Sequence, residues 1–175
     1  MFVGFVTPAA QGARFEVHGG WDRLQSEGVK GDGLLYGVGA GYDVAVAPRV
    51  FLGAEVNADF STAEKCERAV LAGNDKLCIR ARRDLSAVGR LGFGVAAGSQ
   101  VYLLAGYANA RVSADYTPAT GARITESATA DGLRLGAGFQ RALGSSAYTK
   151  VEYRYSNYEA DTVRHQLIAG FGLRF

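Results

Sequence analysis

The chain has 175 residues, enough for one domain, and its charges nearly balance, with 19 lysines and arginines against 17 acidic residues. This balance gives no indication of a nucleic-acid partner, which would call for a strongly basic face. Glycine occurs 24 times with only three prolines and no three-residue period, which excludes a collagen-like chain, and the nine tyrosines and nine phenylalanines argue against disorder.

Residues 1–13 contain a short apolar patch that starts at Phe2 and is followed by small residues. They are similar to the end of a secretory signal peptide with a cleavage point after Gly12 or Ala13, although the basic segment that opens such a peptide is missing. An unstructured leader is the alternative interpretation. In either case we expect the folded domain to span residues 14–175.

From residue 14 onward, apolar residues alternate with polar residues or glycine. In the segment LLYGVGAGYDVAV, Tyr36, Val38 and Tyr42 fall on one face, while Gly37 and Asp43 fall on the other. A period of two indicates β-strands and not helices. The pattern predicts eight strands, at residues 14–24, 34–46, 49–60, 84–96, 101–116, 131–142, 148–158 and 165–175.

The fifth segment, 101–116, alternates less regularly at its start than at its end, so its second half is used to set the two faces. We expect the apolar face of this segment to carry Ala110, Val112, Ala114 and Tyr116. We expect its polar face to carry Asn109, Arg111, Ser113 and Asp115.

The connections between these segments alternate in length. Short turns are predicted around Ala47-Pro48, Gly98-Ser99 and Gly144-Ser145-Ser146. The other connections are predicted as longer loops, at residues 25–33, 61–83 and 117–130, with a shorter one at 159–162. Short turns at one end and long loops at the other are the pattern of an outer-membrane barrel.

The polar face decides between two kinds of eight-stranded barrel. A soluble barrel turns its apolar side chains inward, whereas a transmembrane barrel turns them toward lipid and fills its interior with polar ones. Here the polar face combines many glycines with charges near mid-strand, and the apolar face carries no charge in any strand middle. The alternation therefore predicts an all-β, eight-stranded antiparallel up-and-down transmembrane β-barrel, with short periplasmic turns and longer extracellular loops.

Five charged residues are expected to face the lumen: Glu55, Arg90, Arg134, Glu152 and Arg154. Charges of both signs in a narrow, low-dielectric interior must pair, so we expect the two glutamates to pair with the three arginines. These charges form either a structural plug or a binding or conduction site, and the plug is favoured because eight strands leave no wide channel. His18 is interpreted as a hydrogen-bonding residue of the lumen, and His165 as a residue near a rim.

Aromatic residues of the apolar face separate into two predicted girdles, as membrane interfaces select. One girdle comprises Phe15, Tyr42, Phe93, Phe139, Phe171 and Phe175, and the other comprises Trp21, Tyr36, Phe60, Tyr116 and Tyr155.

The two cysteines, Cys66 and Cys78, lie within the predicted loop 61–83. No Cys-x-x-Cys or Cys/His cluster accompanies them, so a disulfide in an oxidising compartment is favoured over a zinc site. The same loop is basic, and its contact candidates are Lys76, Arg80, Arg82 and Arg83. It is either a solvated loop or a surface that contacts lipopolysaccharide phosphates or acidic host glycans.

The ending AGFGLRF resembles the C-terminal signature of bacterial outer-membrane barrels. The stretches GARFEVHGGWD, LLYGVGAGYDV, YLLAGYANARV, DGLRLGAGFQ and VEYRYSNY resemble strands of the opacity-protein/porin-like family of small eight-stranded barrels, and of the barrel domain of outer membrane protein A. This resemblance implies a Gram-negative outer-membrane location with both termini periplasmic. It also implies that the barrel-assembly machinery reads the last strand, through Phe171, Leu173 and Phe175.

Enzymatic activity is the least favoured interpretation. The stretch YRYSNY is similar to the strand that carries a catalytic His-x-Ser-Asn in lipid A deacylases, but Arg154 occupies the histidine position. Without a base beside it the Ser156 hydroxyl is a weak nucleophile, and Ser156 falls on the inward face. We therefore expect no catalytic residue, metal or cofactor.

Taken together, the sequence predicts a monomeric barrel with a structural or adhesion-like surface role. The expected partners are outer-membrane lipids, lipopolysaccharide and a host or surface ligand at loops 61–83 and 117–130. A narrow, low-conductance porin is the first alternative, and a lipid A-modifying enzyme is the second.

Overall fold

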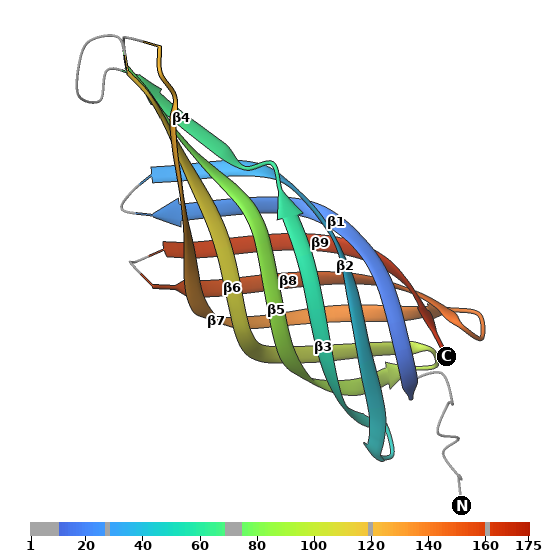
Figure 1. The fold of residues 1–175 in the computed structure, drawn as a ribbon. Helices are drawn as coiled ribbons and strands as arrows, with labels where there is room; N and C mark the ends of the chain where they lie inside the picture. Colours follow the sequence, from blue (N-terminus) through green and yellow to red (C-terminus); the bar gives the residue numbers. More distant parts are fainter. Residues whose placement is uncertain (1–10, 27–28, 69–74, 119–120, 160–161) are drawn as a thin grey trace, which may run out of the picture.

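The computed structural model describes residues 11–175 apart from 27–28, 69–74, 119–120 and 160–161. Within these residues the strands are β1 (Gly12–Ser26), β2 (Val29–Ala47), β3 (Val50–Ser61), β4 (Glu64–Arg68), β5 (Lys76–Ala96), β6 (Ser99–Thr117), β7 (Ile124–Leu143), β8 (Ala147–Tyr158) and β9 (Thr162–Arg174). They form one sheet in the order β3-β2-β1-β9-β8-β7-β6-β5-β4, and an additional β3–β5 pairing closes it. Eight strands therefore make an antiparallel up-and-down barrel, which confirms the predicted fold, and β4 lies beside β5 outside the ring (Figure 1).

The last strand pairs with the first along its whole length. The register between β1 and β9 runs from Arg14 opposite Arg174 to Ser26 opposite Thr162. The backbone N–H of Phe175 then donates a hydrogen bond to the carbonyl of Ala13 at 2.8 Å. Closure satisfies backbone groups that a lipid-exposed strand edge would leave unpaired.

Residues 1–10, most of the predicted leader, lie outside the described residues. β1 begins at Gly12, two residues before the expected start of the folded domain at Arg14.

Three short turns join β2 to β3, β5 to β6 and β7 to β8, as predicted, and they lie at the same end of the barrel as the start of β1 and the end of β9 (Figure 1). Gly98 and Gly144 occupy two of these turns with φ angles of 69° and 90°. Glycine adopts this left-handed region without the steric cost that a side chain brings, so both residues suit tight reversals.

The segments predicted as long loops are largely strand. β1 and β2 remain paired as far as Ser26 opposite Val29, β4 and the start of β5 lie inside 61–83, and β7 begins at Ile124. The loop prediction is wrong for these residues because cross-strand hydrogen bonds satisfy the backbone in water as well as in lipid, so the strands continue beyond the barrel wall. Figure 1 shows β4 and the ends of β5, β6 and β7 rising together at the end opposite the short turns. We call residues 64–68, 76–83, 111–117 and 124–130 the extension.

β6 differs from the prediction in the face that it turns inward. Ala108 and Ala110 are buried in a cluster with Tyr158, on the side of β6 that faces the lumen. Asn109 and Arg111, which were expected inside, lie on the opposite, outward face. The prediction is wrong because small apolar residues also fill the lumen here, so hydrophobicity alone does not mark the lipid side.

The aromatic girdles are mostly where the alternation places them. The expected girdle residues on β1, β2, β3, β5, β7 and β9 are all exposed on the outward face: Phe15, Trp21, Tyr36, Tyr42, Phe60, Phe93, Phe139 and Phe171. Phe175, which follows β9, is 78% exposed. Tyr116 is the exception, because it lies on the extension, on the same face of β6 as Ala110, and its hydroxyl donates to Asp75 at 3.1 Å. The described residues contain no helix long and apolar enough to cross a membrane.

Candidate functional site: the charged lumen and the extension

The interior of the barrel holds a balanced set of buried charges. Among the described residues, the basic ones are Arg14, Arg90, Arg134, Lys150, Arg154, Arg164 and Arg174. The acidic ones are Glu16, Asp22, Asp43, Glu55, Asp59, Asp84 and Glu152. Seven of each sign allow every charge an opposite partner, as a low-dielectric interior requires.

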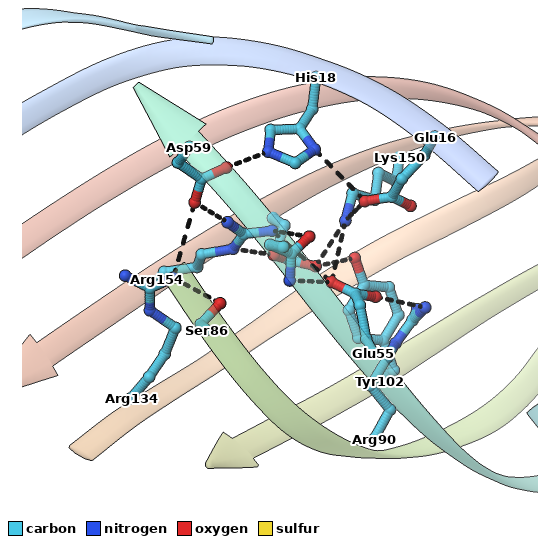
Figure 2. Close-up of polar contacts among 12 residues, drawn as sticks. Glu16, His18, Glu55, Asp59, Ser86, Arg90, Tyr102, Arg134, Lys150 and Arg154 are labelled. Carbon is cyan, nitrogen blue, oxygen red and sulfur yellow. Dashed lines mark hydrogen bonds and ion pairs between the residues drawn. The ribbon is translucent and has the colours of Figure 1, made fainter. Parts of the chain in front are cut away.

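Glu55 on β3 lies at the centre of this network (Figure 2). Its Oε2 accepts a hydrogen bond from Arg14 Nη1 at 2.5 Å and lies 3.2 Å from Arg90 Nη1. Its Oε1 lies 3.7 Å from Arg154 Nη2 and 3.8 Å from Lys150 Nζ. Four cations from β1, β5 and β8 therefore surround one carboxylate, and two of them, Arg90 and Arg154, are contacts expected from the sequence.

Arg154 on β8 connects opposite sides of the barrel. Its Nε donates to Glu152 on its own strand, and its Nη1 donates to Asp59 on β3 at 2.9 Å. Its Nη2 contacts the side-chain oxygen of Asn57 at 3.4 Å. The guanidinium is fully buried, so its fixed fork of donors and these acceptors hold β3 and β8 at a set distance across the lumen.

Arg134 on β7 pairs with aspartates in place of the expected glutamates. Its Nη2 donates to Asp84 at 2.5 Å, and its Nη1 lies 3.6 Å from Asp59. Ser156 and Ser86 accept further hydrogen bonds from it at 2.8 and 2.9 Å. The expectation fails because the alternation predicts only whether a side chain points into the lumen. It does not predict how far along the barrel axis the side chain lies, because the strands are tilted and staggered relative to one another.

The two histidines occupy opposite faces of the barrel wall. His18 is a lumen hydrogen-bonding residue, as interpreted: its Nε2 lies 2.6 Å from Asp59 and its Nδ1 lies 3.4 Å from Glu16. His165 lies on the outward face, where its Nδ1 is 2.6 Å from the Tyr153 hydroxyl and its ring meets Tyr155 edge-on.

Further ion pairs close both ends of the lumen, and these the sequence reasoning did not single out. Near the termini, Asp43 is shared by Arg14 and Arg174, each with a nitrogen 3.1 Å from it. At the other end, Arg164 donates to Asp22 through two hydrogen bonds of 2.7 Å. All of these residues share the inward parity of their segments, so the alternation alone would have identified them had strand ends been considered.

Two tyrosines fill space that glycines leave open. The side chain of Tyr102 lies against Gly138 on the next strand, where a Cβ would come within 2.4 Å of the ring. Tyr148 lies against Gly172 in the same way. Their hydroxyls donate to Glu152 at 2.5 Å and to Glu16 at 2.8 Å. The high glycine content thus makes room for inward aromatics as well as for charges.

Ser156, the residue matched to a deacylase nucleophile, is fully buried in the lumen. Its hydroxyl oxygen accepts a hydrogen bond from Arg134 at 2.8 Å. A cationic donor at this distance withdraws electron density and cannot take the proton that an attacking serine must lose.

The extension is held by a disulfide and by ion pairs on its surface. Cys66 on β4 and Cys78 on β5 are opposite one another and joined, with Cα atoms 4.0 Å apart. Arg80 Nε lies 2.8 Å from Glu64, and Arg80 Nη1 lies 3.3 Å from Asp115. Hydrogen bonding from Arg123 lowers the pKa of Asp115 below its ordinary value, so Asp115 stays ionised at neutral pH.

The contact candidates lie on β5 of the extension. Lys76 and Arg82 are exposed, whereas Arg80 and Arg83 are half-buried.

Glu64, Cys66 and Cys78 bring possible metal-ligand atoms within 4.8 Å of one another. Both sulfurs are committed to the disulfide, so the thiolates that would bind a metal are not formed.

Removal of this disulfide should loosen the extension and leave the barrel intact. On the chain-entropy model, cross-linking a loop of this length contributes about 3 kcal/mol. We expect the double variant Cys66→Ser/Cys78→Ser to be cut by protease in the extension at least about tenfold faster than the parent protein. Heat-modifiable gel migration should be unchanged, because the barrel ring does not include β4. Loss of the compact band would contradict this separation.

A closed barrel with apolar side chains outside and a paired set of charges inside is a transmembrane β-barrel. Residues 1–175 match the family described as "Outer membrane protein beta-barrel domain", and the chain belongs to this family. The protein is therefore an outer-membrane protein. None of the curated proteins compared with the chain matches it.

Solved structures of small outer-membrane barrels share the fold. Ail, the attachment invasion locus protein of Yersinia pestis, is 17% identical with a TM-score of 0.65, over 95% of this chain and 99% of its own. Ail was also solved in complex with the heparin analogue sucrose octasulfate, with 17% identity and a TM-score of 0.64, over 94% of this chain and 99% of its own. Neisserial surface protein A is 16% identical with a TM-score of 0.63, over 95% of this chain and 99% of its own.

Proposed function

We propose that this protein is a monomeric structural and surface-interaction protein of the outer membrane, with an adhesion-like role carried by the extension. The observation that supports this most directly is the contrast between its two ends. Ion pairs fill the lumen from end to end, while four strands continue past the barrel as a disulfide-linked sheet. A barrel with a filled lumen and an ordered extension is better suited to contact with molecules at the cell surface than to transport of solutes through the lumen.

The orientation in the membrane follows from the same asymmetry. The start of β1, the end of β9 and the short turns lie at one end, which faces the periplasm in this proposal, so the extension faces the outside of the cell. Phe171, Leu173 and Phe175 all lie on the outward face of the last strand, at the periplasmic end. We propose that the barrel-assembly machinery reads these three side chains.

The proposed ligand class is an acidic glycan, contacted by the segments 61–83 and 117–130. Lys76 is exposed at the start of β5, and Arg80 lies four register pairs further along the same strand, with Cys78 of the disulfide midway between them. The heparin analogue bound to Ail is a sulfated sugar, so a related fold accommodates this chemistry. A catalytic role is not proposed, because Ser156 is buried beneath the barrel wall and lacks a base.

The test measures binding of a heparin-like sulfated polysaccharide to the refolded protein in uncharged detergent. We expect Lys76→Glu/Arg80→Glu to weaken binding about tenfold, equivalent to about 1.4 kcal/mol, because two attractive contacts become repulsive. Raising the salt concentration should weaken binding of the parent protein, since exposed charges are screened.

The matched control is Arg23→Glu/Lys30→Glu on the β1–β2 hairpin. It reverses the same number of charges, and Arg23, like Arg80, is paired with a carboxylate, at 2.8 Å from Asp32. Binding that is unchanged in the Lys76/Arg80 variant, or that falls equally in both, would refute a recognition role for the extension.

A further inference from the structure

Three arginines gather where the extension leaves the barrel wall. We call them the rim arginines: Arg82, Arg83 and Arg111. Arg83 on β5 pairs in register with Phe60 on β3, whose ring is exposed on the outward face and stacks on Tyr36 with centroids 5.9 Å apart. Residues paired across strands share a face, so Arg83 points outward, in the same row as two aromatics of the outer girdle.

Arg111 lies on the same outward face of the neighbouring strand. Tyr107, Asn109 and Arg111 alternate along β6, and Tyr107 is 52% exposed on the lipid side. Between β5 and β6 the register shifts, with Ala81 opposite Val112 but Asp84 opposite Ala110. Two residues of β5, Arg82 and Arg83, therefore face a single residue of β6, Arg111, and this β-bulge places the three arginines at neighbouring positions of the sheet.

Among the residues that the structure describes, the rim arginines have no acidic partner, whereas three other arginines at the same end of the barrel do. Arg23, Arg80 and Arg123 each bind a carboxylate, at 2.8, 2.8 and 2.5 Å. Among the described residues, no carboxylate forms an ion pair with a rim arginine, and Arg111 donates instead to the Ser127 hydroxyl at 2.9 Å. The Nε of Arg83 is buried without a hydrogen-bond partner.

The carboxylate nearest in register on the outward face does not compensate these charges. Asp131 on β7 is opposite Asn109 and accepts hydrogen bonds from the Asn109 amide, at 2.5 Å, and from the Tyr107 hydroxyl. Both hydrogen bonds reach the same carboxylate oxygen, Oδ1, from groups below the rim arginines, and none of the ion pairs among the described residues joins Asp131 to a rim arginine. Three adjacent cations without a counter-charge repel one another unless an anion joins them.

We infer that the rim arginines bind the phosphate groups of a phosphorylated lipid headgroup in the outer leaflet. The aromatic girdle marks the level at which headgroups lie, and Arg83 is in that row. The planar guanidinium matches phosphate oxygens with two parallel hydrogen bonds. The outward direction selects a lipid of the same membrane over a soluble ligand above the lumen. This site rests on the proposed orientation, with the extension on the extracellular side of the membrane. It does not depend on glycan binding at Lys76 and Arg80.

The experiment uses the full chain in phosphatidylcholine nanodiscs that contain a small fraction of either bisphosphorylated lipid A or lipid A without phosphates. Native mass spectrometry then counts the lipid A retained by the released protein. We expect the parent protein to retain the phosphorylated form at least about tenfold better than the other form. The variant Arg82→Gln/Arg83→Gln/Arg111→Gln should retain at least about tenfold less phosphorylated lipid A than the parent protein, since each arginine near an anionic lipid surface adds to the attraction between protein and lipid.

A matched control, Arg23→Gln/Arg49→Gln/Arg141→Gln, removes three surface arginines that lie away from the bulge. Its retention should change by less than about threefold. Arg82→Lys/Arg83→Lys/Arg111→Lys keeps the charge and should retain an intermediate amount, which provides a second readout should the glutamine variant fail to fold. Equal loss in the control, or equal retention of lipid A without phosphates, would overturn the site. Displacement of lipid A by free inorganic phosphate at comparable concentration would overturn the lipid as its source.

Discussion

Replacing Arg154 by methionine should lower the free energy of unfolding by about 3–5 kcal/mol, the usual cost of removing one partner from a buried charge network. The substitution keeps much of the side-chain volume but removes the cation that contacts Glu152, Asp59 and Glu55. Those carboxylates remain in a low-dielectric interior with fewer opposite charges. The stability loss therefore comes from uncompensated anions and not from a cavity.

The measurement is equilibrium unfolding in urea of the protein folded into lipid vesicles. The single tryptophan, Trp21, lies on the outward face at the outer girdle, so its fluorescence reports transfer from the interface to water. The control is Arg80→Met, which removes a surface ion pair of the extension and should cost about 0–1 kcal/mol. A loss below about 1 kcal/mol for the Arg154 variant would contradict a structural role for the network.

A second variant separates lost charge pairing from lost packing. Combining Arg154→Met with Glu152→Gln and Asp59→Asn removes the cation together with two of the three carboxylates that contact it. Since neutral groups of similar shape often replace a buried ion network at little cost, this triple variant should recover at least about half of the stability lost in the single one. A triple variant less stable than the single one would instead attribute the loss to packing around the side chain.

The fold was predictable from the sequence because the bilayer imposes a strict alternation on every membrane-spanning strand. Lipid accepts Val17, Leu135 or Phe171 on one face, and the narrow interior accepts glycines or paired charges such as Arg90 on the other. The terminal alternation up to Phe175 likewise predicts a last strand that must pair with the first, as the β1–β9 register has it. Each of these inferences requires only knowing whether a side chain points into the lumen or toward the lipid.

The sequence does not predict how far along the barrel axis a side chain lies, or which side chain it contacts across the lumen. Arg134 meets Asp84 because tilted strands bring them to one level, which no local pattern records. The inward face of β6 at Ala108 and Ala110 was missed because these side chains are apolar and yet fill the lumen. The strands of the extension were not predicted because they lie in water. No lipid requires apolar side chains on one face there, so the sequence shows no regular alternation.

Replacing Gly138 by alanine should lower the free energy of unfolding by about 1–3 kcal/mol, the usual cost of overpacking a filled interior. The new methyl group would lie 2.4 Å from the ring of Tyr102, so the ring must move. Movement breaks the hydrogen bond from the Tyr102 hydroxyl to Glu152 and the stacking of Arg90 over the ring, 3.7 Å from its centroid. One methyl group on β7 thereby disturbs the charges of β5 and β8.

Gly89→Ala is the matched control for this substitution. A Cβ at Gly89 has its nearest neighbour at 3.8 Å, an ordinary contact, so the control should be neutral or slightly stabilising through the loss of backbone freedom in the unfolded chain. In the double variant Gly138→Ala/Tyr102→Leu the methyl group meets no ring, so the two substitutions should cost less together than the sum of their separate effects. Urea unfolding followed through Trp21 measures the parent protein, the single variants Gly138→Ala, Gly89→Ala and Tyr102→Leu, and the double variant. Equal stability of the Gly138 and Gly89 variants would show that the tyrosine is free to move, and the glycine would then have no role in fixing the lumen charges.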